Sequence, residues 1–342
     1  MKSFAAFTRK SVSITPQSLV TTAPLSEKLG VVIRPTLPGL SLAAWAGTQR
    51  HWIDELLVQS GALLLRDFHA CDVSEFERFT AAVSSDLLEY RERSSPRQRV
   101  SGNIYTSTDY PPEFGIFLHN ENSYQQTWPL KIFFHCVTAA LEGGETPIAN
   151  CRGVMRSIPA AIVESFRRRG WMYVRNYGDG YGLPWQTVFQ TDDRAEVEAH
   201  CRRHGISVEW KDGARLRTRA VRPAITRHPK TGEEVWFNHA TFFHVTTLEP
   251  SIRESLLRQF DDEELPTDTF YGDGSPIEPE VLDQLRDAYR QNEVMFAWQP
   301  GDVLLLDNML VAHGRSPYLG ERKILVAMAE AFSRNDANAD LE

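Results

Sequence analysis

Two histidines and one glutamate are the residues of this chain whose types and spacing point most directly to chemistry. His119 and Glu121 are separated by a single residue, and His313 follows far downstream. Alternate residues of an extended strand project to the same side, so His119 and Glu121 can bind one ion together. Two imidazoles and one carboxylate can hold a non-haem Fe(II) ion by one face and leave its other positions open. If the fold brings His313 to this pair, the chemistry is oxidative.

The segments around these residues predict how they are positioned. An apolar run over 302–306 predicts a strand that ends at Asp307-Asn308, and we expect His313 on the loop just beyond it. Arg322 stands at the head of a second apolar strand, where a cation can bind a dicarboxylic cosubstrate. The glycines of the segment 143–147 allow close backbone approach, and Thr146 offers a hydroxyl to an anion.

The rest of the chain alternates between short strand patterns and amphipathic helices. Helices are predicted over 45–60, 194–204, 251–260 and 280–292, with a further helix opened by a Ser74-x-x-Glu77 capping box. Strands are predicted over 62–68, 131–138, 170–176, 221–227, 235–238 and 323–329, with a hairpin turn over 229–232. This mixture predicts one α+β domain with a mainly β core, a sandwich or barrel. We expect a flexible lead-in over 1–30, the domain over 31–332 and a tail over 333–342.

Composition excludes several classes of protein. The chain has 342 residues, 42% of them hydrophobic and 24% charged, and a net charge of −8, so neither nucleic acid nor an anionic membrane is an expected partner. No apolar run is long enough to predict a membrane-spanning helix. The four cysteines are widely spaced and form no CxxC pair. A reduced, cytoplasmic setting is the simplest interpretation.

Four segments together resemble the TauD/TfdA superfamily of Fe(II)/2-oxoglutarate dioxygenases, and most closely its SyrP-like and clavaminate-synthase-like branch. They are LHNENSYQQTWP (118–129), GGETPIAN (143–150), YVRNYG (173–178) and LLLDNMLVAHGRSPYLGERKILVAMAE (304–330). The resemblance extends over about 31–330, nearly the whole chain. It implies a double-stranded β-helix, the cupin-like jelly roll, with helical insertions.

The resemblance also implies roles for individual residues. The iron ligands would be His119, Glu121 and His313, with 2-oxoglutarate and dioxygen as cosubstrates. Thr146 matches the family threonine that helps to hold 2-oxoglutarate, and Arg322 is the best match for the arginine that binds its distal carboxylate. Some members place that arginine a little further on, where this chain has Ala327, and Arg315 is therefore the second candidate. A carboxylate at Glu121 argues against the related halogenating enzymes, which lack it.

Substrate contacts are expected on both sides of the His119–Glu121 segment. The candidates are Arg91, Arg93, Asn103, Tyr105, Asn122, Ser123 and Tyr124. A planar guanidinium at Arg91 or Arg93 would pair with the carboxylate of an amino acid, although a solvated charge run explains these arginines equally well. The aromatic segment 238–244, which contains His239 and His244, could line the substrate pocket or belong to the core.

The function that follows is hydroxylation of an unactivated C–H bond, coupled to conversion of 2-oxoglutarate to succinate and carbon dioxide. By analogy with the branch, the substrate would be an amino acid, free or tethered to a peptidyl carrier protein, in antibiotic or other specialised-metabolite biosynthesis. Desaturation or oxidative cyclisation with the same cofactors stays open. Two more distant alternatives are a zinc hydrolase, because two histidines and a glutamate also hold catalytic zinc, and a cupin-like binding module without catalysis.

Overall fold

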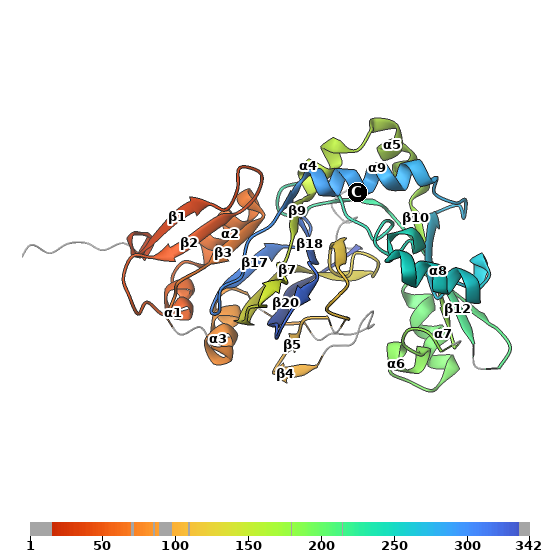
Figure 1. Cartoon of the computed structure of the whole chain (residues 1–342), viewed down its shortest axis with the longest axis horizontal. Coiled ribbons are helices and arrows are strands. Elements are labelled where there is room, and N and C mark those ends of the chain that lie inside the picture. The colour runs from red at the N-terminus through yellow and green to blue at the C-terminus, as the bar shows by residue number, and fades with distance from the viewer. Residues whose placement is uncertain are drawn as a thin grey trace, which may run out of the picture.

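The structure is a computed structural model, and it describes residues 16–69, 72–84, 86–88, 98–108, 110–178, 180–213 and 215–334. Two β-sheets form its centre, and helices cover their outer faces (Figure 1). None of the helices in these ranges is both long and apolar enough to cross a bilayer.

The larger sheet has eight strands, and only β2 and β3 run parallel to one another. Its order is β1 (Val20–Pro24), β2 (Val31–Pro35), β3 (Ala62–Leu65), β17 (Val303–Asp307), β7 (Thr127–Thr138), β20 (Lys323–Ser333), β5 (Ile104–Thr106) and β4 (Arg99–Ser101). The central strands are buried on both faces, which explains their nearly continuous apolar sequences. Along β17, Leu304 and Leu306 pack on the inner face, whereas Val303 and Leu305 pack on the outer face.

The smaller sheet has four strands and carries two of the three candidate metal ligands. Its order is β16 (Glu293–Val294), β9 (Ile148–Asn150), β18 (Val311–Arg315) and β6 (Ile116–His119). One hydrophobic core joins the two sheets, because Ile148 and Val311 of the smaller sheet cluster with Phe134 and Val326 of the larger one. The inner faces of the two sheets therefore pack against each other.

Two groups of helices complete the layers. The outer face of the larger sheet packs against α1 (Leu42–Gly47), α2 (Arg50–Ser60) and α3 (Val73–Val83), which contribute Trp45, Leu57 and Phe79 to a second core. The outer face of the smaller sheet packs against α4 (Cys151–Ser157), α5 (Ala160–Arg169) and α9 (Pro279–Gln291).

A third sheet extends the molecule on the side away from α1–α3 (Figure 1). Its order is β11 (Ile206–Trp210), β12 (Leu216–Arg222), β10 (Trp171–Tyr177) and β15 (Thr267–Tyr271). Beside it lie α6 (Trp185–Phe189), α7 (Arg194–Arg203) and α8 (Pro250–Gln259). Two small sheets complete the fold. The first is a hairpin of β13 (Ile225–Arg227) and β14 (Glu234–Trp236), and the second pairs β8 (Glu142–Gly143) with the distant β19 (Tyr318–Leu319). The 229–232 turn is part of the first hairpin, as predicted.

Three local expectations are wrong. The lead-in predicted as flexible to residue 30 contains β1, which pairs with β2 along its whole length. The single helix predicted over 45–60 is two helices, because the chain turns at Thr48 and Gln49. Ser74 does not cap α3. Asp72 does, by accepting the backbone N–H of Glu75 at 2.8 Å.

Candidate active site

His119 and His313 are direct cross-strand partners, despite their distance in sequence. β6 and β18 pair antiparallel with His119 opposite His313, and the two ring centroids lie 4.5 Å apart. Cross-strand partners project from the same face of a sheet. The neighbouring Leu118 and Ala312 pack on the outer face, so both histidines point inward, where Phe134 of the larger sheet contacts His313. His313 therefore lies within a strand, and its predicted position on a loop is wrong.

Glu121 joins the histidines from a turn. β6 ends at His119, so the expected same-strand geometry of His119 and Glu121 is wrong in detail. The side chain of Asn308 instead holds this turn, with Oδ1 accepting the N–H of Glu121 at 2.8 Å and Nδ2 donating to its carbonyl at 2.9 Å. Asn120 donates to the carbonyl of Asn308 at 2.6 Å and ties the two segments together from the other side. The turn therefore has a fixed geometry.

The three side chains fit a single metal ion. One ligand atom from each of His119, Glu121 and His313 lies within 4.8 Å of the other two. His313 Nε2 and Glu121 Oε2 are 3.7 Å apart, and both side chains are almost fully buried. His119 Nδ1 is 2.9 Å from the carbonyl of Phe117, so Nδ1 carries the proton and Nε2 is left as the ligand atom. A buried carboxylate beside two imidazoles is a suitable donor set for Fe(II).

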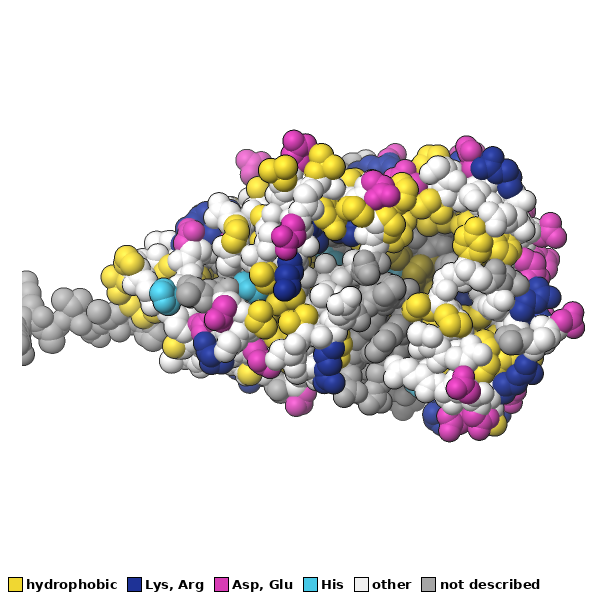
Figure 2. Space-filling view, turned by 60° about the horizontal axis from the view of Figure 1, so that its bottom comes forward, with side chains coloured by type: hydrophobic (Ala, Val, Ile, Leu, Met, Phe, Trp, Pro, Cys, Tyr) yellow, Lys and Arg dark blue, Asp and Glu magenta, His cyan; other side chains and the backbone are white. Residues whose placement is uncertain are grey.

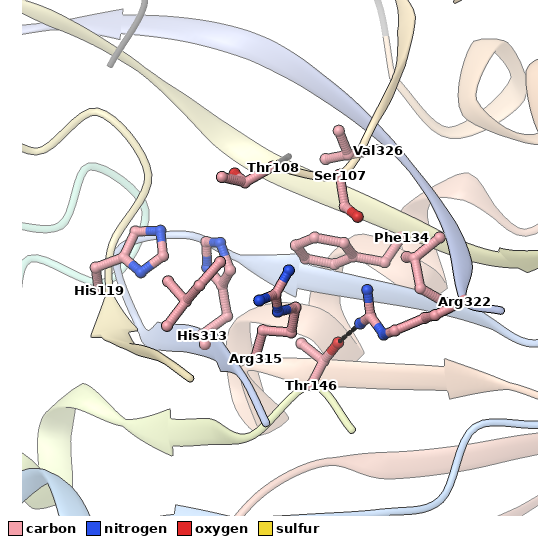
Figure 3. Close-up of a pocket in the computed structure, with 12 residues that line it drawn as sticks. Ser107, Thr108, His119, Phe134, Thr146, His313, Arg315, Arg322 and Val326 are labelled. Carbon is pink, nitrogen blue, oxygen red and sulfur yellow. Dashed lines mark hydrogen bonds between the residues drawn. The ribbon is translucent and has the colours of Figure 1, made fainter. Parts of the chain in front are cut away.

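A cavity extends from the histidines between the two sheets (Figure 3). Its walls include His119, His313, Thr146, Arg315 and Arg322, together with apolar side chains of the larger sheet. Thr146 is buried, and its Oγ1 accepts from Trp298 Nε1 at 3.1 Å and from Arg322 Nη2 at 3.4 Å. Its own O–H is then left to donate to a bound anion. The cavity thus joins a metal-binding end to a cationic end.

The two candidate arginines are used differently. Arg315 donates to the carbonyls of Tyr110, Pro111 and Phe114 at 2.7–2.9 Å, so its guanidinium anchors that segment. Arg322 donates through Nε to Gly144 at 2.7 Å, and its Nη1 makes no hydrogen bond within the described ranges. Burial and the nearby charge of Arg315 lower the pKa of Arg322 to about 10. Arg322 remains charged at neutral pH and has donor capacity for a carboxylate.

Aromatic side chains of the segment 238–244 border the metal-binding end. Phe242 lies 4.4 Å from the ring of His119, and His239 lies 5.6 Å from it. Burial and the proximity of His119 hold the pKa of His239 well below its usual value, so His239 is neutral. Phe242 therefore shields the histidines. His239 is part of the packed surroundings, whereas His244 caps a short turn by accepting the N–H of Thr246 at 3.1 Å.

The substrate candidates separate into groups. Arg91 and Arg93 lie outside the described residues. Asn103 donates to the carbonyl of Leu87 at 2.9 Å, and Tyr105 is buried in the core between the sheets, so neither lines the cavity at the histidines. Ser123 binds His239 Nδ1 at 2.5 Å, and Tyr124 stacks edge-on against the same ring. Asn122 is buried in a left-handed conformation with φ of 58°.

Sequence reasoning missed the residues that hold the turn after Glu121. Besides Asn308, two buried arginines bind its backbone: Arg222 donates to the carbonyl of Tyr124 at 3.0 Å, and Arg334 donates to those of Ser123 and Gln125 at 2.5 and 3.2 Å. Arg334 falls in the segment predicted to be a tail. The Asp307-Asn308 pair at the end of a predicted strand pointed to a polar turn near the site. Its hydrogen bonds to the segment of Glu121 could not be predicted, because they depend on the tertiary fold.

Comparison with known proteins agrees with this geometry. The family model described as "Taurine catabolism dioxygenase TauD, TfdA family" matches residues 21–328. Dapdiamide synthesis protein DdaC of Enterobacter agglomerans is 43% identical over 280 residues, covering 82% of this chain and 85% of that protein. A clavaminate synthase-like protein of Arabidopsis thaliana is 29% identical over 307 residues, covering 86% and 90%.

A solved structure shows the same fold. PvcB, an Fe, alpha-ketoglutarate dependent oxygenase from an isonitrile synthetic pathway, superimposes with a TM-score of 0.54 at 17% identity over 94% of each chain. The predicted family is confirmed, and the zinc hydrolase and the non-catalytic binding module lose their support. This chain belongs to the TauD/TfdA family and is a non-haem Fe(II)- and 2-oxoglutarate-dependent dioxygenase.

Proposed function

We propose that His119, Glu121 and His313 hold the iron, and that the enzyme hydroxylates an unactivated C–H bond of an amino acid. The substrate is free or tethered to a carrier protein, and the pathway makes a specialised metabolite. One observation carries the proposal: three ligand atoms within 4.8 Å of one another open into a cavity whose far wall is Thr146 and Arg322. Two facing sheets, with His119 and His313 on the inner face of the smaller one, also support a double-stranded β-helix core.

The cosubstrate end of the cavity follows from its charges. Arg322 binds the distal carboxylate of 2-oxoglutarate through its guanidinium, and Thr146 donates its hydroxyl to the same carboxylate. Trp298 fixes the Thr146 hydroxyl in place. The keto acid end then points along the cavity toward His119 and His313.

The remaining residues position and protect the reacting groups. When bound, the iron supplies, with 2-oxoglutarate and dioxygen, the oxidising power to break a C–H bond. Asn308 fixes the turn of Glu121, and the Phe117 carbonyl orients His119. Phe134 and Val326 line the cavity with apolar surface, and Phe242 covers His119, so water is kept from the site.

The pathway assignment rests on relatives. DdaC is named for dapdiamide synthesis and PvcB for an isonitrile synthetic pathway, and both are pathways of specialised metabolism. The amino acid substrate continues the expectation drawn from the clavaminate-synthase-like branch.

Mass spectrometry of the product tests the proposal. Protein loaded with Fe(II) under anaerobic conditions receives 2-oxoglutarate and then oxygen, with amino acids presented free or on a carrier protein. Gain of one oxygen atom with formation of succinate supports hydroxylation, whereas loss of two hydrogens identifies desaturation or cyclisation. His119→Ala and Glu121→Ala should abolish substrate-dependent succinate formation, and His51→Ala, at an exposed position on α2, should not. Normal turnover in both site variants contradicts the metal assignment.

A further inference from the structure

A second cavity, of about 520 Å³, borders the turn that follows Glu121. One wall is this turn, with Asn122 and Gln125, and the opposite wall is α7, with His200 and Arg203. Phe189, at the end of α6, also lines the cavity. The cavity therefore connects the immediate sequence neighbour of a proposed iron ligand with the outer lobe of the molecule.

The charge of this cavity differs from that of the chain. The chain carries a net charge of −8, and acidic and basic side chains are interspersed on the face seen in Figure 2. Among the described residues, those that line the cavity include Arg203, His200 and His204 and no aspartate or glutamate. The Arg203 side chain has no ion-pair partner among the described residues. A small anion can supply the missing counter-charge.

The helix dipole offers a simpler explanation for these basic residues, because cations are favoured at a helix C-terminus. That effect applies equally to Arg202 and Arg203, which both belong to the last turn of α7. Only Arg203 lines the cavity. Arg202 is therefore a natural control for the dipole effect.

Asn122 provides an independent sign of a ligand at the opposite wall. It is only 7% exposed, and its Oδ1 is buried without a hydrogen-bond partner in the described part of the chain. Leaving such an acceptor unpaired is unfavourable, because it loses its hydrogen bonds to water on burial. Arg334 and Arg222 hold the following carbonyls, so the turn cannot easily relax to satisfy it. An N–H or O–H group of a ligand would satisfy Oδ1.

The size of the cavity indicates how long that ligand is. One water molecule occupies roughly 30 Å³ in the liquid, and we take this as the volume of one non-hydrogen atom of a ligand. An amino acid of about ten such atoms then needs at most about 300 Å³. The cavity of about 520 Å³ exceeds this and lies in the range of sites for larger small molecules. A free amino acid would fill only part of this volume.

We propose that this cavity is the outer part of the substrate site and takes an elongated substrate with an anionic far end. Arg203 binds the anion, and Asn122 accepts a hydrogen bond from an amide or amine nearer the metal ligands. The inference rests on the proposed function, because it concerns the substrate of the same reaction. The anion is either a carboxylate at the end of an acylated amino acid or the phosphate of a phosphopantetheine arm.

Calorimetric titration of the metal-free protein tests this proposal with two matched pairs of probes. One pair is 4′-phosphopantetheine and pantetheine, and the other is N-succinylalaninamide and N-acetylalaninamide. We expect at least one anionic probe to bind tenfold or more tightly than its neutral partner. Arg203→Gln should remove that difference, Arg202→Gln should preserve it, and Asn122→Ala should weaken both members of the pair.

The outcomes separate the two sources of the anion. Preference for 4′-phosphopantetheine assigns the site to a tethered substrate, and preference for N-succinylalaninamide assigns it to a free acid. Equal binding of charged and neutral probes, no binding of any probe, or equal effects of Arg203→Gln and Arg202→Gln overturns the proposal. Iron binding is measured separately on the same variants. If the probes do not behave as expected but one Fe(II) binds per chain, only the outer substrate site is refuted and the proposed function stands. If the wild-type protein does not bind Fe(II), the proposed function itself is refuted.

Discussion

Replacement of Arg322 by methionine should weaken 2-oxoglutarate binding without removing the metal. Methionine replaces the aliphatic part of the side chain but cannot donate a hydrogen bond or carry charge. Arg322 lies in the wall of the cavity that also contains His119 and His313, and its Nη1 is available to a ligand within the described structure. The variant therefore removes a cation from the position where the distal carboxylate is proposed to bind.

The size of the effect follows from the number and type of bonds lost. A hydrogen bond to a charged group contributes about 1.5–3 kcal/mol, and a guanidinium can make two to one carboxylate. We expect about 3 kcal/mol, because the charge of Arg315 remains nearby. That loss corresponds to a dissociation constant for 2-oxoglutarate on the order of 100-fold higher. Arg322→Lys keeps the charge without the planar fork and should give an intermediate value.

Anaerobic calorimetry on the metal-loaded protein measures this constant, with thermal unfolding as a check on the fold. Arg315→Met is the matched comparison. Arg315 binds three backbone carbonyls, so its loss should reduce folded stability more than 2-oxoglutarate affinity. If Arg322→Met retains the wild-type dissociation constant while Arg315→Met loses binding, the assignment of the carboxylate to Arg322 is wrong.

The pH dependence of binding gives a second check on the same residue. Arg322 has a pKa lowered to about 10 by burial and by the charge of Arg315, so in the free enzyme it is predominantly protonated below pH 9. The 2-oxoglutarate dissociation constant should change little between pH 7 and 9 and rise steeply as the pH passes 10. A change centred between pH 7 and 8 would show that another group controls binding.

Three further predictions concern the framework of the site. Asn308→Ala removes three hydrogen bonds that hold Glu121 and Pro129. It should lower the free energy of unfolding in urea by about 2–4 kcal/mol and weaken Fe(II) binding in equilibrium dialysis. An unchanged metal affinity would mean that the turn keeps Glu121 in position without Asn308. Lys131 is 1% exposed and ion-paired with two carboxylates, so Lys131→Ala should lose about 3–5 kcal/mol of unfolding free energy. A loss below about 1 kcal/mol would show that these ion pairs contribute little to stability. Burial raises the pKa of Asp268 to about 6 from 3.8, so the folded state binds this proton more tightly than the unfolded state. The resulting stabilisation of the folded state is present below pH 3.8 and is lost as the pH rises through 6. Asp268→Asn should therefore gain up to about 3 kcal/mol relative to the wild type between pH 4 and 7, and parallel stability curves for the two proteins would refute this.

The regular parts of the fold were largely predictable because their side-chain periodicity is strong. The strands predicted over 131–138 and 323–329 lie within β7 and β20, and the helix predicted over 280–292 is α9 within a residue at each end. These segments bury one or two faces, and burial requires apolar residues at regular intervals in the sequence. The predicted strand over 221–227 is instead divided between β12 and β13, because the chain turns at residues 223 and 224 into a separate hairpin.

The candidate site was predictable in its composition but not in its geometry. The spacing of His119 and Glu121 suggested neighbours on one strand, whereas the pairing of β6 with β18 brings the two histidines together and a turn brings the carboxylate. Cross-strand register between segments far apart in sequence depends on tertiary packing. Arg334 shows the same limit, because a polar C-terminal segment gives no sign that its arginine binds the backbone beside Glu121.

The most direct test of the account is the metal stoichiometry and coordination of anaerobically purified protein, measured by equilibrium dialysis with Fe(II) and by X-ray absorption at the iron edge. We predict one Fe(II) per chain with two imidazole ligands, one of them lost in His313→Ala, and binding weakened at least tenfold in Glu121→Ala. Tight stoichiometric binding that persists unchanged in His119→Ala, Glu121→Ala and His313→Ala would contradict the central claim.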